Sequence, residues 1–350
     1  MKFKKRIKIR NIWVGGKSDA CFVIAEAGSN HNRNFETAKK LILAAKEARA
    51  DAVKFQTYSA ETLYPKDKEP LRQIGERTRP FDVIKAVELP RQWQKTLAKY
   101  AKLKNIIFMS TPFDKEAIDE VSSLSPVIKW ASPELIDRPL LEYAAKKGKP
   151  LFISTGFYGI KEVTDALYWV QKSGNNQVVL LQCTGLYPTE FEDVNLKAMI
   201  TMKNKFNVPI GFSDHTMSTI TPALAVAMGA KVVEKHFTLD RKMKGPDHQF
   251  ALEPDELKEM VKNIRDAEKS LGNEMKKPVL REVEKEKLIR RGVVSKMYIK
   301  KGESFSIKNI CTKRVGRGAL PAYDFFNMIG KISKRDINKD RPVNLKDAIS

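Results

Sequence analysis

Two histidines each stand at the end of a short apolar run, where their rings could share one divalent ion. His215 follows the run at residues 209–213, and His236 ends the run at 231–236. Imidazole nitrogens combined with oxygens from water, a carboxylate or a substrate suit Mn, Fe, Co or Zn. A lone buried histidine is more often a packed, hydrogen-bonded ring, but a pair at neighbouring strand ends favours a metal site.

A second group of side chains could bind an anion. Two ammonium groups and four hydroxyls stand at or just after the ends of other apolar runs, namely Lys54, Thr111, Lys129, Ser132, Ser154 and Ser213. Such donors form hydrogen bonds to the oxygens of a phosphate or carboxylate. Lysines that reach solvent and hydroxyls that cap helices would explain any one of them, but explain all six less well.

The remaining polar groups could move protons or hold sugar hydroxyls. Glu26, Glu134 and Asp247 are the candidates for these roles. Further polar residues stand at the run ends, including Ser110, Gln182, Asp214 and Lys235. Cys183 has no adjacent base in the sequence, so we interpret it as a packing residue.

These residues must be positioned by alternating strands and helices. Eight short runs rich in Val, Ile and Phe predict strands, at residues 21–26, 52–55, 106–110, 127–130, 150–154, 177–183, 209–213 and 231–236. Segments between them, such as 34–49, 115–122, 161–173 and 219–229, have helical spacing of apolar residues. Repeated strand–helix units predict a closed (β/α)8 TIM barrel of the α/β class, whose functional residues gather at the C-terminal strand ends.

The flanking segments predict additions to the barrel. Residues 7–14 alternate like short strands and are expected to cap the barrel bottom, whereas the proline-rich stretch 65–90 is expected to lie above the barrel. After a helix at 254–271, the charged run 276–291 indicates a linker, and the remainder indicates a small β-rich module. We therefore predict two domains, 1–284 and 285–350.

Composition limits the classes of partner. The 350 residues carry a formal charge of +22, but the lysines are spread among glutamates and not interleaved with aromatics, which argues against nucleic-acid binding. No apolar run approaches the eighteen or so residues of a membrane span, and no signal-peptide core follows the first residues, so we expect no membrane association and a cytoplasmic location. The three cysteines lack metal-ligand or disulfide spacing.

The same residues lie in motifs that resemble the bacterial sialic acid synthase family. The motifs are Ala25-Glu26-Ala27-Gly28-Ser29-Asn30-His31, Lys54-Phe55-Gln56-Thr57, Ser110-Thr111-Pro112-Phe113, Ser154-Thr155-Gly156, Cys183-Thr184 with Tyr187-Pro188, Gly211 to Thr216, Glu234 to Thr238 and Gly245-Pro246-Asp247-His248. Lys313-Arg314 with Gly316 lies in a segment that resembles the antifreeze-like SAF domain of this family. The resemblance covers essentially the whole chain.

The resemblance implies a synthase that condenses phosphoenolpyruvate with N-acetylmannosamine or a related acylamino sugar and releases phosphate. It implies a divalent ion, most often Mn²⁺, on His215 and His236, where it would polarise the aldehyde of the sugar. Phosphoenolpyruvate would be held by Lys54, Thr111, Lys129, Ser132, Ser154 and Ser213. Glu26, Glu134 and Asp247 would surround the sugar and the attacking water, and Gln56, Tyr187 and Glu234 would position substrate.

The chain departs from the family pattern at two places that bear on the substrate. Pro133 stands where the family often has Gly, and Gly185 stands where it often has Asn after Cys-Thr, which removes one possible sugar contact. Related synthases make legionaminic or pseudaminic acid or use a 6-phosphorylated sugar, so our primary prediction of an N-acetylneuraminate synthase has these alternatives. Less favoured are another phosphoenolpyruvate-dependent keto-deoxy sugar phosphate synthase and an inactive barrel with a binding module.

The resemblance also implies a homodimer in which the C-terminal domains are exchanged. Arg314 of one subunit would reach the acylamino group of the sugar in the other. A linker of about sixteen residues extends to roughly 50 Å, enough to cross between subunits.

Overall fold

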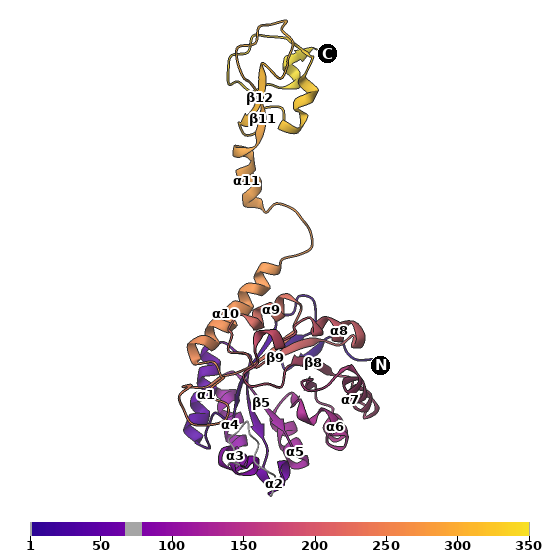
Figure 1. Ribbon diagram of the computed structural model, residues 1–350, viewed down its shortest axis with the longest axis vertical. Coiled ribbons are helices and arrows are strands. Elements are labelled where there is room, and N and C mark those ends of the chain that lie inside the picture. Colours follow the sequence, from indigo (N-terminus) through magenta and orange to yellow (C-terminus); the bar gives the residue numbers. More distant parts are fainter. Residues whose placement is uncertain (1, 67–78, 350) are drawn as a thin grey trace. The chain divides into compact units, whose positions relative to one another are not determined.

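Eight parallel strands form the centre of the first of two units, Met1–Gly272 and Asn273–Ser350 (Figure 1). The computed structural model describes residues 2–66 and 79–349. The strands are β3 (Phe22–Gly28), β4 (Ala52–Thr57), β5 (Ile107–Pro112), β6 (Ile128–Trp130), β7 (Leu151–Ser154), β8 (Val178–Cys183), β9 (Ile210–Asp214) and β10 (Val232–His236). Each overlaps one of the eight predicted runs.

The strands curve into a nearly closed barrel. Hydrogen bonds join them in the order β5-β4-β3-β10-β9-β8-β7-β6, and the two end strands, β5 and β6, also lie in contact. This arrangement confirms the predicted TIM-like barrel. Helices cover the outside of the strands (Figure 1). They are α1 (Phe35–Glu47), α4 (Arg91–Leu103), α5 (Lys115–Leu124), α6 (Arg138–Ala145), α7 (Ile160–Lys172), α8 (Ala198–Phe206), α9 (Thr221–Ala227) and α10 (Pro254–Leu271).

Side-chain alternation along the strands separates two hydrophobic cores. Val23, Val53 and Ile153 point outward and pack in the core shared with the helices. Phe22 and Val179 point inward and fill the lower barrel. Because the period of a strand is two residues, every second residue beyond these inward positions also faces the barrel axis.

An N-terminal hairpin closes the bottom of the barrel, as predicted. Strands β1 (Ile7–Ile9) and β2 (Ile12–Val14) pair antiparallel. Ile7, Ile9 and Val14 are buried in the same cluster as the inward residues at the strand starts. The lower barrel is therefore an apolar core, and polar groups remain for the upper end.

One short helix precedes the predicted excursion at residues 65–90, and another lies within it. They are α2 (Ala60–Leu63) and α3 (Pro80–Val87), while residues 67–78 of that stretch lie outside the described residues. No helix in the described part of the chain is long and apolar enough to cross a membrane.

The second unit is a small β-rich module with its own core. Strand β11 (Arg291–Ser295) pairs antiparallel with β12 (Ile310–Arg314), and β13 (Ile332–Ser333) pairs with β14 (Ala348–Ile349). Val293, Phe305, Met328 and other apolar side chains are buried between these elements. The charged run predicted as a linker contains helix α11 (Leu280–Ile289), so the predicted boundary after residue 284 falls within this helix.

Candidate active site

The inward residues at the upper strand ends line one small cavity. The structure brings together Glu26, Lys54, Gln56, Thr111, Lys129, Ser132, Ser154, Tyr187, Ser213, His215, Glu234 and His236 there, with Cys183 and Phe113 between them. Alternation explains much of the grouping, because every strand except β9 contributes the residue two positions beyond its last inward apolar side chain. Ile24 precedes Glu26 in this way, and Met109 precedes Thr111.

Lys54 is buried in this cavity among oxygen atoms. Its Nζ lies 2.9 Å from Glu26 Oε2 and 3.7 Å from Glu234 Oε2, and it donates a hydrogen bond of 2.8 Å to Thr111 Oγ1. Burial opposes the charged ammonium, but the carboxylates of Glu234 and Glu26 outweigh it and raise the pKa of Lys54. Lys54 is therefore a fixed positive charge.

Lys129 lies near the other carboxylate oxygen of Glu234. Its Nζ donates hydrogen bonds to Ser154 Oγ at 2.7 Å and to the Trp130 carbonyl at 3.0 Å. It lies 3.6 Å from Glu234 Oε1. Burial lowers the pKa of Lys129, and Glu234 only partly offsets that effect. Glu234 therefore joins the two lysines.

Glu234 itself remains ionised. Burial would raise its pKa, but Lys129 and Lys54 hold the pKa below its usual value. Ser213 Oγ adds a hydrogen bond of 3.2 Å to Glu234 Oε1. The cavity thus contains a carboxylate flanked by two cations and by hydroxyl donors.

Glu26 is a cavity carboxyl group whose pKa is raised to near neutral pH. Burial raises its pKa to about 7, although Lys54 opposes the shift. Gln56 Nε2 donates a hydrogen bond of 2.9 Å to Glu26 Oε1. Oε2 has the ion pair with Lys54 but accepts no aligned hydrogen bond from the described residues. Glu26 can therefore exchange a proton in the cavity.

The two predicted metal ligands face each other across the cavity. The ring centroids of His215 and His236 are 5.5 Å apart. His215 Nδ1 lies 2.7 Å from the Thr184 carbonyl, which requires a proton on Nδ1, so that Nε2 has a free lone pair whenever the ring is neutral. A backbone carbonyl in this role orients metal-binding histidines. Burial opposes the charged ring, but the Cys183 thiol and the Thr184 carbonyl outweigh it and raise the pKa of His215.

His236 has an unsatisfied ring nitrogen. Its Nδ1 is buried and has no hydrogen-bond partner among the described residues. Burial, with His215 and Lys54 nearby, lowers the pKa of His236 well below its usual value, so the ring is neutral. A neutral, buried and unpartnered imidazole fits a divalent ion.

The histidine pair has no third protein ligand beside it in the described part of the chain. In residues 2–66 and 79–349, no group of three or more His, Cys, Asp or Glu side chains is placed to hold a metal. The sequence analysis allowed oxygen ligands from water, a carboxylate or substrate, and an ion on His215 and His236 would here need them from water or substrate. Such an open coordination sphere is typical of catalytic sites.

Asp247 reaches the rim of the cavity from the loop after β10. Its Oδ2 accepts a hydrogen bond of 2.9 Å from Ser29 Oγ, and burial raises its pKa. Gly28 has φ +51°, and a Cβ there would lie 2.9 Å from Asp247 Oδ2 and 3.4 Å from Glu26 Oε1. Glycine therefore allows the two carboxyl groups to approach.

Besides Asp247, two further predicted residues do not line the cavity. Glu134 follows Ser132 and Pro133 in a 3₁₀ turn (Pro133–Ile136), and its Oε2 is buried without a hydrogen-bond partner in the described residues. Burial raises the pKa of Glu134 to about 7. Arg314 is exposed at the end of β12 in the second unit, where its backbone is paired with Arg291, and its side chain makes no hydrogen bond or ion pair with residues in the described ranges.

Some polar strand-end residues point away from the cavity. Lys235 forms an outward, buried ion pair with Asp214 at 2.8 Å. Ser110 also faces outward, where its Oγ lies 2.7 Å from Thr57 Oγ1. The strand period separates these residues from the site, so polarity at a strand end does not by itself identify a functional residue.

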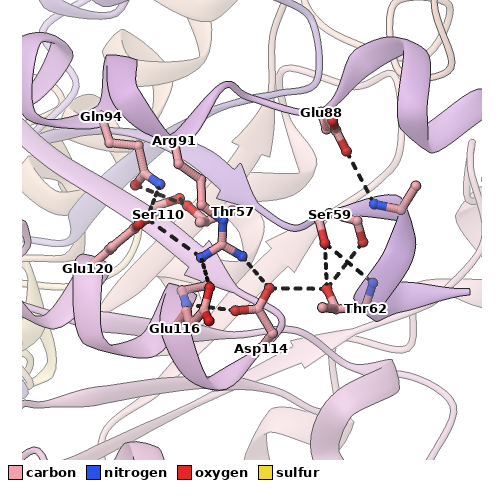
Figure 2. A network of polar contacts seen from close by, with 12 residues as sticks. Thr57, Ser59, Thr62, Glu88, Arg91, Gln94, Ser110, Asp114, Glu116 and Glu120 are labelled. Atoms are coloured by element: carbon pink, nitrogen blue, oxygen red, sulfur yellow. Dashed lines mark hydrogen bonds and ion pairs between the residues drawn. The ribbon is translucent and has the colours of Figure 1, made fainter.

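Thr57 and Ser110 belong to a polar network behind β4 and β5 (Figure 2). Gln94 of α4 accepts a hydrogen bond of 3.1 Å from Thr57 Oγ1 and donates one of 2.9 Å to Glu120 of α5. All three of Thr57, Ser110 and Gln94 are buried. The network ties the ends of the strands that carry Lys54 and Thr111 to the surrounding helices.

Arg91 and Asp114 extend this network to the surface (Figure 2). Arg91 pairs with Asp114, and Asp114 Oδ1 caps α5 by accepting a hydrogen bond of 2.7 Å from Ala117 N. Asp114 Oδ2 also accepts a hydrogen bond of 3.1 Å from Thr62 Oγ1 in α2. One carboxylate thus joins three elements around the upper end of β5.

Sequence reasoning did not predict two contacts of the histidine pair. The Thr184 carbonyl holds His215, and Phe250 lies 5.2 Å from the His236 ring. Phe250 follows the Gly245–His248 motif closely, which is the one signal that could have indicated it. A backbone carbonyl gives no residue-type signal at all.

Comparisons with known proteins agree with this geometry. The model of the NeuB family matches residues 41–276. The chain is 42% identical over 332 residues to the N,N'-diacetyllegionaminic acid synthase of Legionella pneumophila, covering 92% of this chain and 93% of that protein. It is 36% identical over 321 residues to the pseudaminic acid synthase of Campylobacter jejuni, covering 90% and 93%.

A solved structure shows the same fold. The N-acetylneuraminic acid synthetase of Leptospira borgpetersenii, crystallised with citrate, aligns with a TM-score of 0.72 and 33% identity, over 81% of this chain and 96% of that one.

Proposed function

The chain belongs to the NeuB family of phosphoenolpyruvate-dependent synthases of sialic-acid-type sugars, and we propose that its acceptor is a 2,4-diacetamido sugar, from which it makes a legionaminic-acid-type product. The observation that carries the activity is the cavity in which buried Lys54 and Lys129, with their hydroxyl neighbours, face the pair His215 and His236. Burying the lysines beside the histidines is unfavourable unless they bind something, and this combination suits an anion next to an electrophile.

The acceptor is chosen from the relatives. The relative named for N,N'-diacetyllegionaminic acid shares more residues with this chain than the one named for pseudaminic acid. Its name states two acylated nitrogens in the product, which the acceptor must supply. These names favour the alternative drawn from the sequence over our primary prediction, N-acetylmannosamine.

Phosphoenolpyruvate would bind where the buried cations lie. Lys54, Lys129, Thr111, Ser154 and Ser213 would donate hydrogen bonds to its phosphate and carboxylate oxygens, with Ser132 at the cavity edge. Glu234 would hold the two ammonium groups at a fixed separation. Gln56 and Tyr187 would position the sugar.

Carbon–carbon bond formation needs an activated aldehyde. C3 of phosphoenolpyruvate attacks the aldehyde carbon of the open-chain sugar, and the aldehyde oxygen takes up a proton. A divalent ion on His215 and His236, which we expect to be Mn²⁺, would supply Lewis-acid polarisation of that oxygen when bound. Asp247 would orient sugar hydroxyls from the rim.

Water completes the reaction at C2. Its oxygen bonds to C2 while a carboxylate accepts its proton, and the bond from C2 to the phosphate oxygen then breaks to give the keto acid and phosphate. Glu26 and Glu134 are the candidate bases, because the pKa of each lies at about 7, where a carboxyl can accept and return a proton.

The second unit would complete the site from a partner subunit. By resemblance, Arg314 reaches the acylamino group of the sugar bound by the other subunit, so the active form is a domain-exchanged homodimer. The side chain of Arg314 is exposed and has no polar partner in the described part of the chain, which supports a role at an interface or a ligand.

Phosphate release from phosphoenolpyruvate tests the proposal. The purified protein should be assayed with Mn²⁺ and, separately, a 2,4-diacetamido sugar, N-acetylmannosamine, its 6-phosphate and a keto-deoxy sugar phosphate precursor. We expect the 2,4-diacetamido sugar to give the highest kcat/KM. Higher kcat/KM with N-acetylmannosamine would contradict the acceptor, and no release with any sugar would contradict the activity.

A further inference from the structure

The ring of Phe157 occupies the space in which a side chain at position 185 would stand. A Cβ atom built on Gly185 would lie 2.0 Å from Cζ and 2.2 Å from Cε1 of Phe157. These distances are far shorter than the roughly 3.5 Å of carbon–carbon contact. Any other residue at 185 would force the Phe157 ring to move, so the two positions are sterically coupled.

The backbone of Phe157 has an unusual conformation. Its φ of +68° lies in the left-handed region, which bulky side chains rarely adopt. Its side chain gains little from burial in return, because Phe157 is 65% exposed. Residues in rare backbone conformations gather at ligand-binding positions. An exposed aromatic ring in such a conformation suggests that a ligand covers it.

The Phe157 ring lies beside the catalytic cavity. Phe157 and Gly185 line a pocket of about 570 Å³ formed by the loops after β7 and β8 and by the first turns of α7 and α8, whereas the cavity among the lysines and histidines measures about 60 Å³. Cys183 lines both. Because Cys183 is common to both spaces, part of a sugar bound at the histidines would extend into the larger pocket.

Backbone contacts fix this pocket to the catalytic residues. The Gly156 amide, next to Phe157, donates a hydrogen bond of 3.0 Å to Ser132 Oγ. The Thr184 carbonyl, next to Gly185, contacts His215 Nδ1 at 2.7 Å. The wall of the pocket at Gly185 is therefore held at a fixed position relative to the histidines.

The lining of the pocket identifies the chemistry of that substituent. Among the described residues that line it, Lys197 alone carries a charge. The rest are neutral polar or apolar, including Tyr158, Leu186 and Met202. A single lysine is a weak site for a sugar phosphate, which several cationic or amide donors normally bind. An acylamino group, with an apolar methyl and a neutral amide, fits this lining.

We propose that Phe157, with its ring over Gly185, forms the apolar wall of a subsite that receives the second acylamino group of the acceptor sugar. The two residues then determine specificity together, because the ring takes the place of a polar side chain at 185. This inference rests on the proposed function and names the feature of the chain that selects its substrate.

Steady-state kinetics of three variants test the subsite. Phe157→Ala should raise the KM for the 2,4-diacetamido sugar about tenfold, the usual effect of losing a small apolar contact, and leave kcat and the KM for phosphoenolpyruvate unchanged. Gly185→Asn should act in the same direction by displacing the ring. The double variant should be no worse than either single variant, because both remove one contact, and should shift preference toward N-acetylmannosamine.

Controls separate the subsite from other causes. Tyr168→Ala, on the exposed face of α7, removes an aromatic ring 50% exposed and should change no kinetic constant. Phe157→Leu keeps an apolar side chain and should give an intermediate KM. Thermal melting and sedimentation of each variant should match the wild type.

The outcomes distinguish the inference from the function beneath it. An active wild type whose acceptor KM is unchanged in both Phe157→Ala and Phe157→Leu overturns the subsite alone. Fully additive losses in the double variant overturn the coupling. A changed sedimentation coefficient for Phe157→Ala would assign the ring to a subunit interface instead. A wild type that releases no phosphate with any sugar overturns the proposed function and this inference together.

Discussion

Lys54 and Glu26 form a buried ion pair in which Nζ lies 2.9 Å from Oε2, and each side chain is no more than 3% exposed. Burying either charge alone would be strongly unfavourable. Together with Lys129 and Glu234, the pair forms a group of two cations and two carboxyls at the barrel mouth. This balance lets the chain fold around ammonium groups that are needed for an anionic substrate.

Replacing either lysine should weaken phosphoenolpyruvate binding more than sugar binding. A charged hydrogen bond contributes about 1.5 to 3 kcal/mol, so Lys54→Ala or Lys129→Ala should lower affinity about tenfold to a hundredfold. Titration calorimetry measures the change. Lys161→Ala is the control, since Lys161 has only an exposed pair with Asp165 at 3.0 Å. Unchanged affinity in both active-site variants would contradict the anion-binding role.

Activity should depend on a divalent ion held by the histidine pair. The buried Nδ1 of His236 lacks a partner among the described residues, so an ion would satisfy an otherwise unfavourable group. Chelator treatment should abolish phosphate release, and Mn²⁺ should restore it. His215→Ala with His236→Ala should remove bound metal, measured by elemental analysis. Full activity of a metal-free preparation would refute this prediction.

The pH dependence of kcat should identify the base that activates water. Burial raises the pKa of both Glu26 and Glu134 to about 7. A base must be deprotonated, so kcat should rise as the pH increases through about 7 and then level off. The variant, Glu26→Gln or Glu134→Gln, that loses this rise identifies the base. A wild-type kcat that stays constant from about pH 5 to 9 would exclude both.

The raised carboxyl pKa values also make the stability of the fold depend on pH, in the direction opposite to that of kcat. A carboxyl whose pKa is raised in the folded state favours folding while it is protonated. Its contribution is therefore lost as the pH rises from the ordinary carboxyl range through about 7. Glu134→Gln should flatten this part of the stability profile in chemical denaturation.

The network behind β4 and β5 should stabilise the site from outside. Gln94→Leu removes hydrogen bonds to Thr57 and Glu120 and should lower the free energy of unfolding by about 1 to 3 kcal/mol. It should also raise the KM for phosphoenolpyruvate, because Lys54 and Thr111 lie on the strands it anchors. Gln92→Leu, at an exposed position on the same helix, is the control. Equal effects of the two substitutions would show that the network is not specific.

Two inactive variants should complement each other if the C-terminal domains are exchanged. Arg314→Ala lacks the arginine that resemblance places at the partner's site, and His236→Ala lacks a metal ligand. Mixed dimers prepared by co-refolding would contain one intact site, so activity should partly return. No recovery in verified mixed dimers, or a fully active wild-type monomer, would argue against exchange.

The sequence predicted the strands better than the direction of their side chains. All eight apolar runs are strands, because a strand buried on both sides leaves a continuous apolar signal. The inward position of Lys54 and the outward position of Lys235 could not be separated, since both are lysines at strand ends. Only the register of the barrel distinguishes them.

Contacts made by loops were the least predictable. The overlap of Phe157 with Gly185 joins two loops that are separated in the chain, and Ser29 contacts Asp247 across more than two hundred residues. The spacing within either segment contains no information about the other. Family motifs named Asp247 but could not indicate its partners.

The hairpin of β1 and β2 leaves the barrel open at its upper end alone, as far as the described residues show. Ile7, Ile9 and Val14 close the lower end. Substrates must therefore enter, and products must leave, through the mouth above Lys54 and His236. Under the proposed function, phosphoenolpyruvate occupies the floor and the sugar stands above it. A bound sugar therefore blocks the entry of phosphoenolpyruvate, so the substrates bind in a fixed order with phosphoenolpyruvate first. A product that has not yet left the mouth competes with the next substrate for the same opening.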